Sequence, residues 1–340
     1  TNTLTFTYTV QPGDQTPDLE ALDASALALG GAVIADAAGN LAGLALPALG
    51  SPQSLGGSKA IVIDAIAPGV TDVTASTLDG RYKAGDVITI EVHTSDAVTI
   101  AGAGTPTLAL ETGSTDQLAT YTGGSGTNTL TFTYTVQPGD QTADLEALAT
   151  NALALAGGSI RDAAGNAAAL ALPALGGAGS IGGSKAIVID GVTPTVTTVT
   201  STTPDGAYKA GATVLVTVTT TEAVTFTGGT PTLLLETGTI DRSATLVAGN
   251  GTTSLVFSYT VQPGDATVDL DYKTAGAIAL NGATATDLAG NPADLTLPAP
   301  GTPGSLGSNK NILIDTAAPN ALLVSSTTAD GTYKAGDLIT

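Results

Sequence analysis

Acidic side chains recur in this sequence at a nearly constant interval, and they are its best candidates for chemistry. Asp64, Asp190 and Asp315 close the related sequences IVID, IVID and ILID, 126 and then 125 residues apart. The motif DAAGN at 36–40 and 162–166 returns as DLAGN at 287–291, which repeats an Asp and an Asn in the same phase. Carboxylate, amide and backbone carbonyl oxygens are the ligands of hard divalent cations, and Ca²⁺ accepts irregular loop geometry. The chemistry that this pattern could support is therefore calcium binding.

Other kinds of chemistry find little support in the residue types. The chain has no Cys, so disulfides and thiolate ligands are excluded. Its single histidine, His93, has Thr219 at the equivalent position of the next repeat, and no Ser-His-Asp set recurs. The net charge of −20 disfavours nucleic-acid binding, which needs a basic surface. We therefore expect no enzymatic activity, no nucleic-acid partner and, because no apolar run approaches ~18 residues, no membrane span in this segment.

The interval between the acidic residues also predicts the domain organisation. The stretch TNTLTFTYTVQPGD at 1–14 returns identically at 127–140, and as TTSLVFSYTVQPGD at 252–265. A repeat of this length is too long for a solenoid unit and has the size of an autonomous domain. Each seam is expected after the VID sequence, before a Pro and a Thr/Val-rich run. This phasing predicts a C-terminal half-repeat at 1–65, complete repeats at 66–190 and 191–315, and the start of a further repeat at 316–340. Because the sequence begins and ends within a repeat, we expect an internal piece of a longer chain.

Alternating polarity predicts that each repeat is built from β-strands. In 129–136, Leu130, Phe132, Tyr134 and Val136 alternate with threonines, which is typical of a strand with one buried and one solvated face. The same inner face is expected in the first copy, for Leu4, Phe6, Tyr8 and Val10. Further strands are expected at 69–75, 86–93, 97–100, 106–111, 117–122, 157–163, 166–173 and 185–190. Gly, Asp, Asn and Pro separate them at the spacing of an all-β sandwich.

Several motifs together resemble a known family of repeats. The sequences YKAGD, SDAVT or TEAVT, TPTL followed by LETG, FTYTVQPGD, DAAGN and KAIVID resemble the Ig-like, cadherin-like tandem repeats of giant secreted bacterial surface proteins and adhesins. The resemblance covers essentially the whole chain. It implies tandem Ig-like β-sandwich domains arranged as beads on a string in an extracellular stalk or fibre, often stiffened by calcium.

Sandwich topology predicts which oxygens could converge at a junction between repeats. One expected set joins the linker to an early loop and to the DAAGN loop, through Asp64, Asp96, Asp162 and Asn166. The next junction would repeat it with Asp190, Glu222, Asp287 and Asn291. Asp79 and Asp86 lie at the opposite end and could contribute to the following junction. The alternative interpretation is that these residues only form turns, with Asp side chains accepting hydrogen bonds from local backbone N–H groups.

The function expected from these observations is structural. The chain would be the repeat region of a long bacterial cell-surface protein, an adhesin shaft, stalk or surface filament, with Ca²⁺ at its domain junctions. Its partners would be the neighbouring domains of the same chain. One alternative is a filament or sheath subunit that self-assembles with identical chains. Another is a glycan- or surface-binding module, which usually needs exposed aromatic residues, whereas aromatic residues make up 4% of this chain and Trp is absent.

Overall fold

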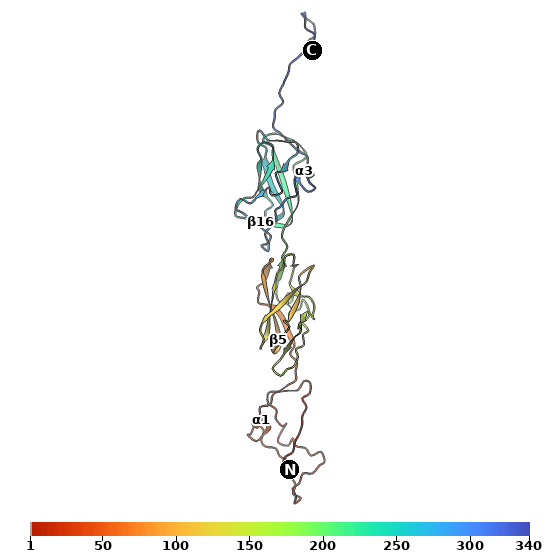
Figure 1. The fold of residues 1–340 in the computed structure, drawn as a ribbon, viewed down its shortest axis with the longest axis vertical. Coiled ribbons are helices and arrows are strands. Elements are labelled where there is room, and N and C mark those ends of the chain that lie inside the picture. The colour runs from red at the N-terminus through yellow and green to blue at the C-terminus, as the bar shows by residue number, and fades with distance from the viewer. Residues whose placement is uncertain (1) are drawn as a thin grey trace. The chain divides into compact units, whose positions relative to one another are not determined.

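The computed structural model describes residues 2–340 and divides into two compact units, one ending at Val192 and the other spanning Thr193–Thr340 (Figure 1). The protein is all-β: in the described residues the only helices are single turns. Each unit has its own hydrophobic core, drawn from residues 73–189 in the first and 199–314 in the second. These cores lie within the ranges that the sequence predicts for the two complete repeats. No helix in the described part of the chain is long and apolar enough to cross a membrane.

The first unit contains two helical turns, α1 (Leu55–Ser58) and α2 (Ile181–Ser184). Its strands are β1 (Gln15–Thr16), β2 (Ile63–Asp64), β3 (Val70–Ala75), β4 (Gly80–Tyr82), β5 (Val87–Gly102), β6 (Thr107–Glu111), β7 (Gln117–Gly123), β8 (Thr127–Thr135), β9 (Gln141–Thr142), β10 (Glu146–Ala147), β11 (Leu153–Ala154), β12 (Gly158–Arg161) and β13 (Ile187–Asp190). One sheet has the order β10-β6-β7-β8-β5-β12, with β3 also on β5 and β11 also on β6. A smaller sheet has the order β4-β13-β9, in which β4 and β13 are parallel.

The second unit repeats this plan with one helical turn, α3 (Leu306–Asn309). Its strands are β14 (Val196–Ser201), β15 (Gly206–Tyr208), β16 (Thr213–Thr227), β17 (Thr232–Glu236), β18 (Arg242–Ala248), β19 (Thr252–Thr260), β20 (Ala266–Thr267), β21 (Asp271–Tyr272), β22 (Ile278–Ala279), β23 (Thr284–Thr286) and β24 (Ile312–Asp315). The larger sheet runs β14-β16-β19-β18-β17-β21, with β22 on β17 and β23 on β16, and the smaller one runs β15-β24-β20. Equivalent strands therefore make equivalent pairs in both units.

The alternation in β8 produces the predicted buried face. Leu130, Phe132 and Tyr134 are buried, and they belong to the same core cluster as Ile187 and Ile189 of β13. Side chains of the larger and the smaller sheet thus pack into one core. This confirms the two-faced strand that the sequence predicts for residues 129–136.

Strand β5 differs from the prediction, which divides it into strands at 86–93 and 97–100. It is a single long strand (Figure 1), and its register against β8 shifts between His93 and Val98. Its first part pairs with β8 and β3, and its last residues pair with β12. An irregularity of this kind bends a strand and increases its twist, so one strand can serve two sets of partners. Polar residues in the middle of the strand conceal its continuity from a reading of the sequence.

The two terminal segments do not form the strands that their sequences favour. Residues 2–10 have no regular secondary structure, and Phe6 is 75% exposed, whereas the equivalent Phe132 is fully buried. The expectation of a buried inner face for the first copy is therefore wrong in this structure. The physical reason is that nothing in the structure pairs with residues 2–10 as β5 and β7 pair with β8. Residues 316–340 likewise contain no helix or strand.

Candidate functional site

The DAAGN loop is the centre of the predicted junction, and its Asp is used to close the loop on itself. In 162–166, Asp162 Oδ1 accepts the backbone N–H of Asn166 at 2.8 Å, and Oδ2 accepts the Asn166 side-chain amide at 2.8 Å. The backbone N–H of Asp162 also donates to the carbonyl oxygen of Asn166. Gly165 has a φ of 94°, a left-handed conformation that glycine adopts without strain. The Asp therefore acts first as a turn residue.

These hydrogen bonds also determine the direction in which the pKa of Asp162 is shifted. Burial raises the pKa of Asp162, but hydrogen bonds from the side chain and backbone of Asn166 outweigh burial and hold the pKa below its usual value. Asp36 and Asp287 make the equivalent pairs of bonds to Asn40 and Asn291. The same closed loop is therefore present in all three copies of the motif.

One contact joins the DAAGN loop to the seam residue Asp64. The side-chain amide of Asn166 donates to the backbone carbonyl oxygen of Asp64 at 3.0 Å, across 102 positions of sequence. The Asp64 carboxylate accepts the backbone N–H of Ile66 at 3.2 Å. Asp96 lies within β5, where its carboxylate accepts the Ser95 hydroxyl. One direct bond thus joins Asn166 to the Asp64 backbone, while Asp162 is bonded to Asn166 within the loop.

The second predicted set is divided between the two units. Asp190 ends β13 in the first unit, and its carboxylate accepts the backbone N–H of Val192 at 3.4 Å. Glu222 lies within β16 of the second unit, and its carbonyl oxygen accepts the Thr220 hydroxyl at 2.6 Å. Asp287 and Asn291, both buried, form the DLAGN loop of the same unit. The metal-binding role of this set stays a prediction.

Asp79 and Asp86 hold backbone segments within the first unit. Asp79 accepts the backbone N–H of Ala186 at 3.1 Å, just before β13. Asp86 accepts the backbone N–H and the ammonium group of Lys83, at 3.0 and 2.8 Å. The bond from the Lys83 ammonium is the main reason why the pKa of Asp86 is lowered. A cation next to a carboxylate disfavours a second cation there, so Asp86 is a poor metal ligand in this arrangement.

A buried Tyr–Asp pair is the strongest recurring polar feature, and motif analysis missed it. Tyr134 Oη donates to Asp140 Oδ2 at 2.6 Å, and the backbone N–H of Gln137 donates to the same oxygen at 2.8 Å. The other carboxylate oxygen accepts the side-chain amide of Gln117 at 3.0 Å. Burial, and secondarily the neighbouring carboxylate, raises the pKa of Tyr134. The sequence signal was the constant spacing of six residues between this Tyr and this Asp.

In the second unit the same pair gains an ionic partner. Tyr259 Oη donates to Asp265 Oδ2 at 2.6 Å, and Arg242 Nε donates to Oδ1 at 2.9 Å. Burial raises the pKa of Asp265, but bonds from Tyr259, the Gln262 backbone and Arg242 outweigh it, so the pKa is lowered overall. The carboxylate is 1% exposed on its side chain and fully bonded within the repeat. It is a structural acceptor rather than a reactive group.

A second feature missed from the sequence is a carboxylate that caps each helical turn. Glu146 Oε2 accepts the Ser180 hydroxyl at 2.6 Å and the backbone N–H groups of Gly176 and Gly182 at 2.9 and 3.3 Å. Glu20 makes the same set of bonds in the N-terminal copy, where the hydrogen bond from Ser54 chiefly lowers its pKa to about 2. These bonds join strand β10 to the chain around α2. These hydrogen bonds are structural and do not form a catalytic arrangement.

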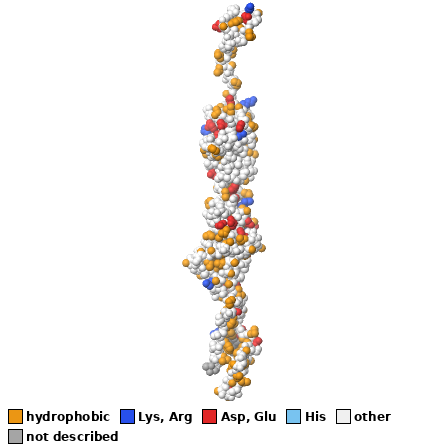
Figure 2. Space-filling model, turned by 90° about the vertical axis from the view of Figure 1, so that its right-hand side faces the viewer, with side chains coloured by type: hydrophobic (Ala, Val, Ile, Leu, Met, Phe, Trp, Pro, Cys, Tyr) orange, Lys and Arg blue, Asp and Glu red, His pale blue; other side chains and the backbone are white. Residues whose placement is uncertain are grey.

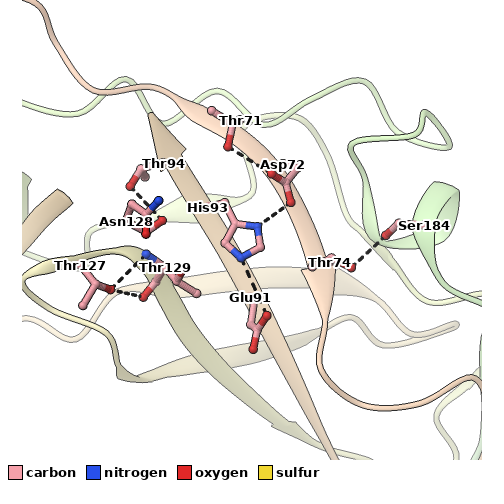
Figure 3. A network of polar contacts seen from close by, with 10 residues as sticks. All are labelled: Thr71, Asp72, Thr74, Glu91, His93, Thr94, Thr127, Asn128, Thr129 and Ser184. Carbon is pink, nitrogen blue, oxygen red and sulfur yellow. Dashed lines mark hydrogen bonds and ion pairs between the residues drawn. The ribbon is translucent and has the colours of Figure 1, made fainter. Parts of the chain in front are cut away.

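The single histidine lies in a polar network on the surface of the first unit (Figure 3). His93 of β5 stands opposite Asp72 of β3, and its Nδ1 lies 2.6 Å from Asp72 Oδ1. Its Nε2 is 3.8 Å from Glu91 Oε2. Thr198 and Thr219 form the equivalent cross-strand pair in the second unit. The network therefore belongs to one repeat and not to the shared design.

The recurring Tyr and Lys near β4 also make the contacts expected of structural residues. Tyr82 Oη donates to the Leu78 carbonyl oxygen at 2.7 Å, and Tyr208 does the same to Pro204 at 2.7 Å. Lys83 pairs with Asp86. In the first unit these contacts are a Lys–Asp pair beside a Tyr bonded to the backbone, and in the second unit the Asp is replaced by Ala212, so only the Tyr contact recurs.

Comparisons with known proteins leave the structure itself as the basis for assigning a function. No protein-family model matches the chain, and a search of curated proteins finds no match.

Proposed function

We propose that this chain is a structural region of a long extracellular bacterial surface protein, built from tandem Ig-like β-sandwich domains that act as an adhesin shaft, stalk or surface filament. The proposal combines the family resemblance of the motifs with the repeated fold. The observation that carries it is how the recurring polar residues are used. The Tyr–Asp pair and the Glu146 carboxylate bond groups of their own repeat. The Asp–Asn loop does so as well, and its Asn166 also bonds the Asp64 carbonyl oxygen across the seam.

Such usage favours a mechanical role because it joins distant parts of each repeat. Glu146 of β10 bonds Ser180 next to α2, and Asp79 next to β4 bonds Ala186 next to β13, so charge-assisted hydrogen bonds hold segments that lie far apart in the repeat. Parallel β4 and β13 add backbone bonds between the same regions. A load applied along the chain would have to break these bonds together.

Single-molecule force spectroscopy on the chain tests this proposal. A repeat of about 125 residues, fully extended at ~3.3–3.6 Å per residue, should release roughly 400 Å of chain as it unfolds. We expect two separate rupture events with this increment, one for each hydrophobic core. Gradual extension without discrete events would reject the mechanical role.

The calcium component of the proposal concerns Asp64, Asp162 and Asn166. The Asn166 side-chain amide bonds both the Asp64 carbonyl oxygen and the Asp162 carboxylate, and carboxylate, amide and carbonyl oxygens are the ligand types that Ca²⁺ uses. Each carboxylate oxygen that accepts one hydrogen bond retains a second lone pair. These residues therefore fit a cation in type, with the turn bonds left in place.

Calcium binding is tested by thermal unfolding in Ca²⁺ and in a chelator. A ligand at 100 times its Kd stabilises the folded state by about 2.7 kcal/mol, so the melting temperature of the first unit should rise with Ca²⁺. The Asp64→Asn variant keeps an oxygen for the Ile66 N–H but loses the charge, so only the Ca²⁺-dependent increase should disappear. Asp23→Asn is the matched control, because Asp23 lies in an exposed turn with Ser25. Identical melting in Ca²⁺ and chelator would remove calcium from the proposal and leave the sandwich in place.

A further inference from the structure

The polar network around His93 brings a nitrogen ligand and an oxygen ligand together on one face of a strand (Figure 3). Glu91 and His93 are two positions apart in β5, and side chains at this spacing in a strand point to the same face. His93 Nε2 lies 3.8 Å from Glu91 Oε2, and the two side chains are 30% and 29% exposed. The pair is therefore close together and accessible from solvent.

Asp72, on the neighbouring strand β3, orients the imidazole ring. His93 Nδ1 lies 2.6 Å from Asp72 Oδ1, and because an ionised carboxylate only accepts hydrogen bonds, Nδ1 is the donor. In the neutral ring the lone pair is then on Nε2, the nitrogen that faces Glu91. The other oxygen of Asp72 accepts the Thr71 hydroxyl at 3.1 Å, which holds the carboxylate in place.

This arrangement is the one that metal-binding histidines use. Such a histidine donates its second ring N–H to a carboxylate or a carbonyl oxygen, which fixes the tautomer and makes the other nitrogen more basic. Asp72 makes this contact with His93, and Glu91 offers a carboxylate oxygen beside the remaining nitrogen. The network thus contains two ligands and the partner that positions one of them.

The distance between the two ligand atoms fits a bridging ion better than a direct hydrogen bond. N–H···O hydrogen bonds span about 2.7–3.2 Å between heavy atoms, which is shorter than the 3.8 Å from His93 Nε2 to Glu91 Oε2. An ion bound tetrahedrally at about 2.0–2.2 Å from each atom places them roughly 3.4 Å apart. A movement of about 0.4 Å by the Glu91 side chain would reach this geometry.

We propose that Glu91 and His93 bind a divalent transition-metal ion of the zinc type, with Asp72 as the positioning residue and water completing the coordination. Imidazole nitrogen suits Zn²⁺, Cu²⁺ and Ni²⁺, whereas Ca²⁺ takes oxygen ligands. The second unit has Thr217 and Thr219 at the equivalent positions, so the site belongs to the first unit alone. It is separate from the calcium proposed at the seam and does not depend on the proposed function.

The charges around the network favour a cation. Within the described residues, the ion pairs of Asp72 and Glu91 are with His93 and not with a Lys or Arg. The residues opposite Glu91 and His93 on β3 and β8 include Thr74, Thr129 and Thr131, which are uncharged. The whole chain has 10 basic against 30 acidic residues, and Lys and Arg are scattered over the face drawn in Figure 2. A negative surface of this kind raises the local concentration of cations.

Proton NMR tests the site directly, because His93 is the only histidine and the chain has no cysteine. The single imidazole Cε1–H signal should shift or broaden as Zn²⁺ is added until it saturates, and Ca²⁺ should leave it unchanged. Hydrogen exchange should slow in β3 and β5 with Zn²⁺, whereas the equivalent strands β14 and β16 should show no change.

Variants compared by titration calorimetry with Zn²⁺ separate the three roles. Asp72→Asn should lower the zinc affinity by about tenfold or more, as loss of an orienting carboxylate does. Glu91→Gln and His93→Thr each remove a ligand and should weaken binding further. His93→Thr introduces the residue that the second unit has at this position, so the fold should tolerate it. Glu111→Gln is the matched control, because it removes the same charge from β6 and should leave the affinity unchanged.

Two results would overturn the proposal. Zinc binding of equal affinity in the wild type and in His93→Thr would show that the other carboxylates of the chain hold the ion. Loss of binding in His93→Thr without any effect of Glu91→Gln or Asp72→Asn would show a lone surface imidazole and no built site. Neither result bears on the calcium experiment, which measures a different ion at Asp64.

Discussion

Removing one hydroxyl from the buried Tyr–Asp pair should cost measurable stability. In Tyr134→Phe, Asp140 loses the 2.6 Å bond to Oη but keeps its bonds from Gln117 and the Gln137 backbone. A hydrogen bond to a charged group contributes ~1.5–3 kcal/mol. Because two of the three donors remain, we expect a loss near the lower end, about 1.5–2 kcal/mol, of the unfolding free energy of the first unit.

The chain supplies its own control for this measurement. Tyr8 makes the same contact to Asp14, but its side chain is exposed to water, which can replace the lost bond. Tyr8→Phe should therefore leave stability unchanged. Hydrogen exchange followed by mass spectrometry can measure β8 and β19 separately, which suits a protein with two cores and no Trp. Equal exchange of β8 in the wild type and in Tyr134→Phe would refute the assigned stabilising role.

The corresponding pair in the second unit predicts a pH dependence with a definite sign. The pKa of Asp265 is lowered in the folded protein. A carboxylate of this kind stabilises the fold above its unfolded pKa, about 3.9, and this stabilisation disappears as pH falls through the folded value. Tyr259→Phe should therefore destabilise the second unit at pH 7, and its difference from the wild type should shrink below about pH 4. A difference that stays constant down to pH 2 would contradict this assignment.

Two further predictions are each paired with a control substitution. Phe132→Ala should destabilise the first unit by ~3–5 kcal/mol, as expected for a buried aromatic residue, whereas Phe6→Ala should have no measurable effect by the same hydrogen-exchange assay. Gly183→Ala would place a Cβ 1.8 Å from the carbonyl oxygen of Gly177 and should cost ~1–3 kcal/mol in chemical denaturation. Gly123→Ala, with no atom within 4 Å of the added Cβ, should change stability by less than about 0.5 kcal/mol.

The all-β class could be predicted because its signal is local. The alternation of apolar and polar residues along 129–136 predicts a strand with one buried face, and β8 shows this alternating burial. The continuity of β5 could not be predicted, because the polar residues 94–96 are typical of a loop, although the backbone stays extended through a register shift between His93 and Val98. The exposure of Phe6 could not be predicted from its own sequence either, since Phe132 has identical neighbours. Burial depends on partner strands, which local pattern does not encode.

The candidate residues were partly predictable, and the limit was again long-range pairing. Recurrence identified Asp162 and Asn166, and their Asx-type loop follows from known turn chemistry. Sandwich topology placed Asp64 and the DAAGN loop in one expected junction, but only the three-dimensional structure shows that the Asn166 side-chain amide donates to the Asp64 carbonyl oxygen. Glu146 was overlooked because its donors lie 30 or more residues away, around α2.

Differences between the two units indicate what the recurring carboxylates do. At the Tyr–Asp pair, Gln117 in the first unit is replaced by Arg242 in the second, while the Tyr hydroxyl and backbone donors stay the same. Asp271 in the second unit takes the place of Glu146, the carboxylate that bonds the chain around α2. It still accepts a glycine backbone N–H, from Gly301 instead of Gly176. At the Tyr–Asp pair, one side-chain donor varies, whereas the Tyr hydroxyl and the backbone donors stay. A carboxylate that accepts backbone N–H groups fixes a loop without requiring apolar bulk, so a chain with few aromatic residues and no disulfide can hold its loops this way. Part of the acidic composition thus serves these hydrogen bonds between carboxylates and backbone N–H groups. A cation bound at the seam between repeats would stabilise the fold in addition to them.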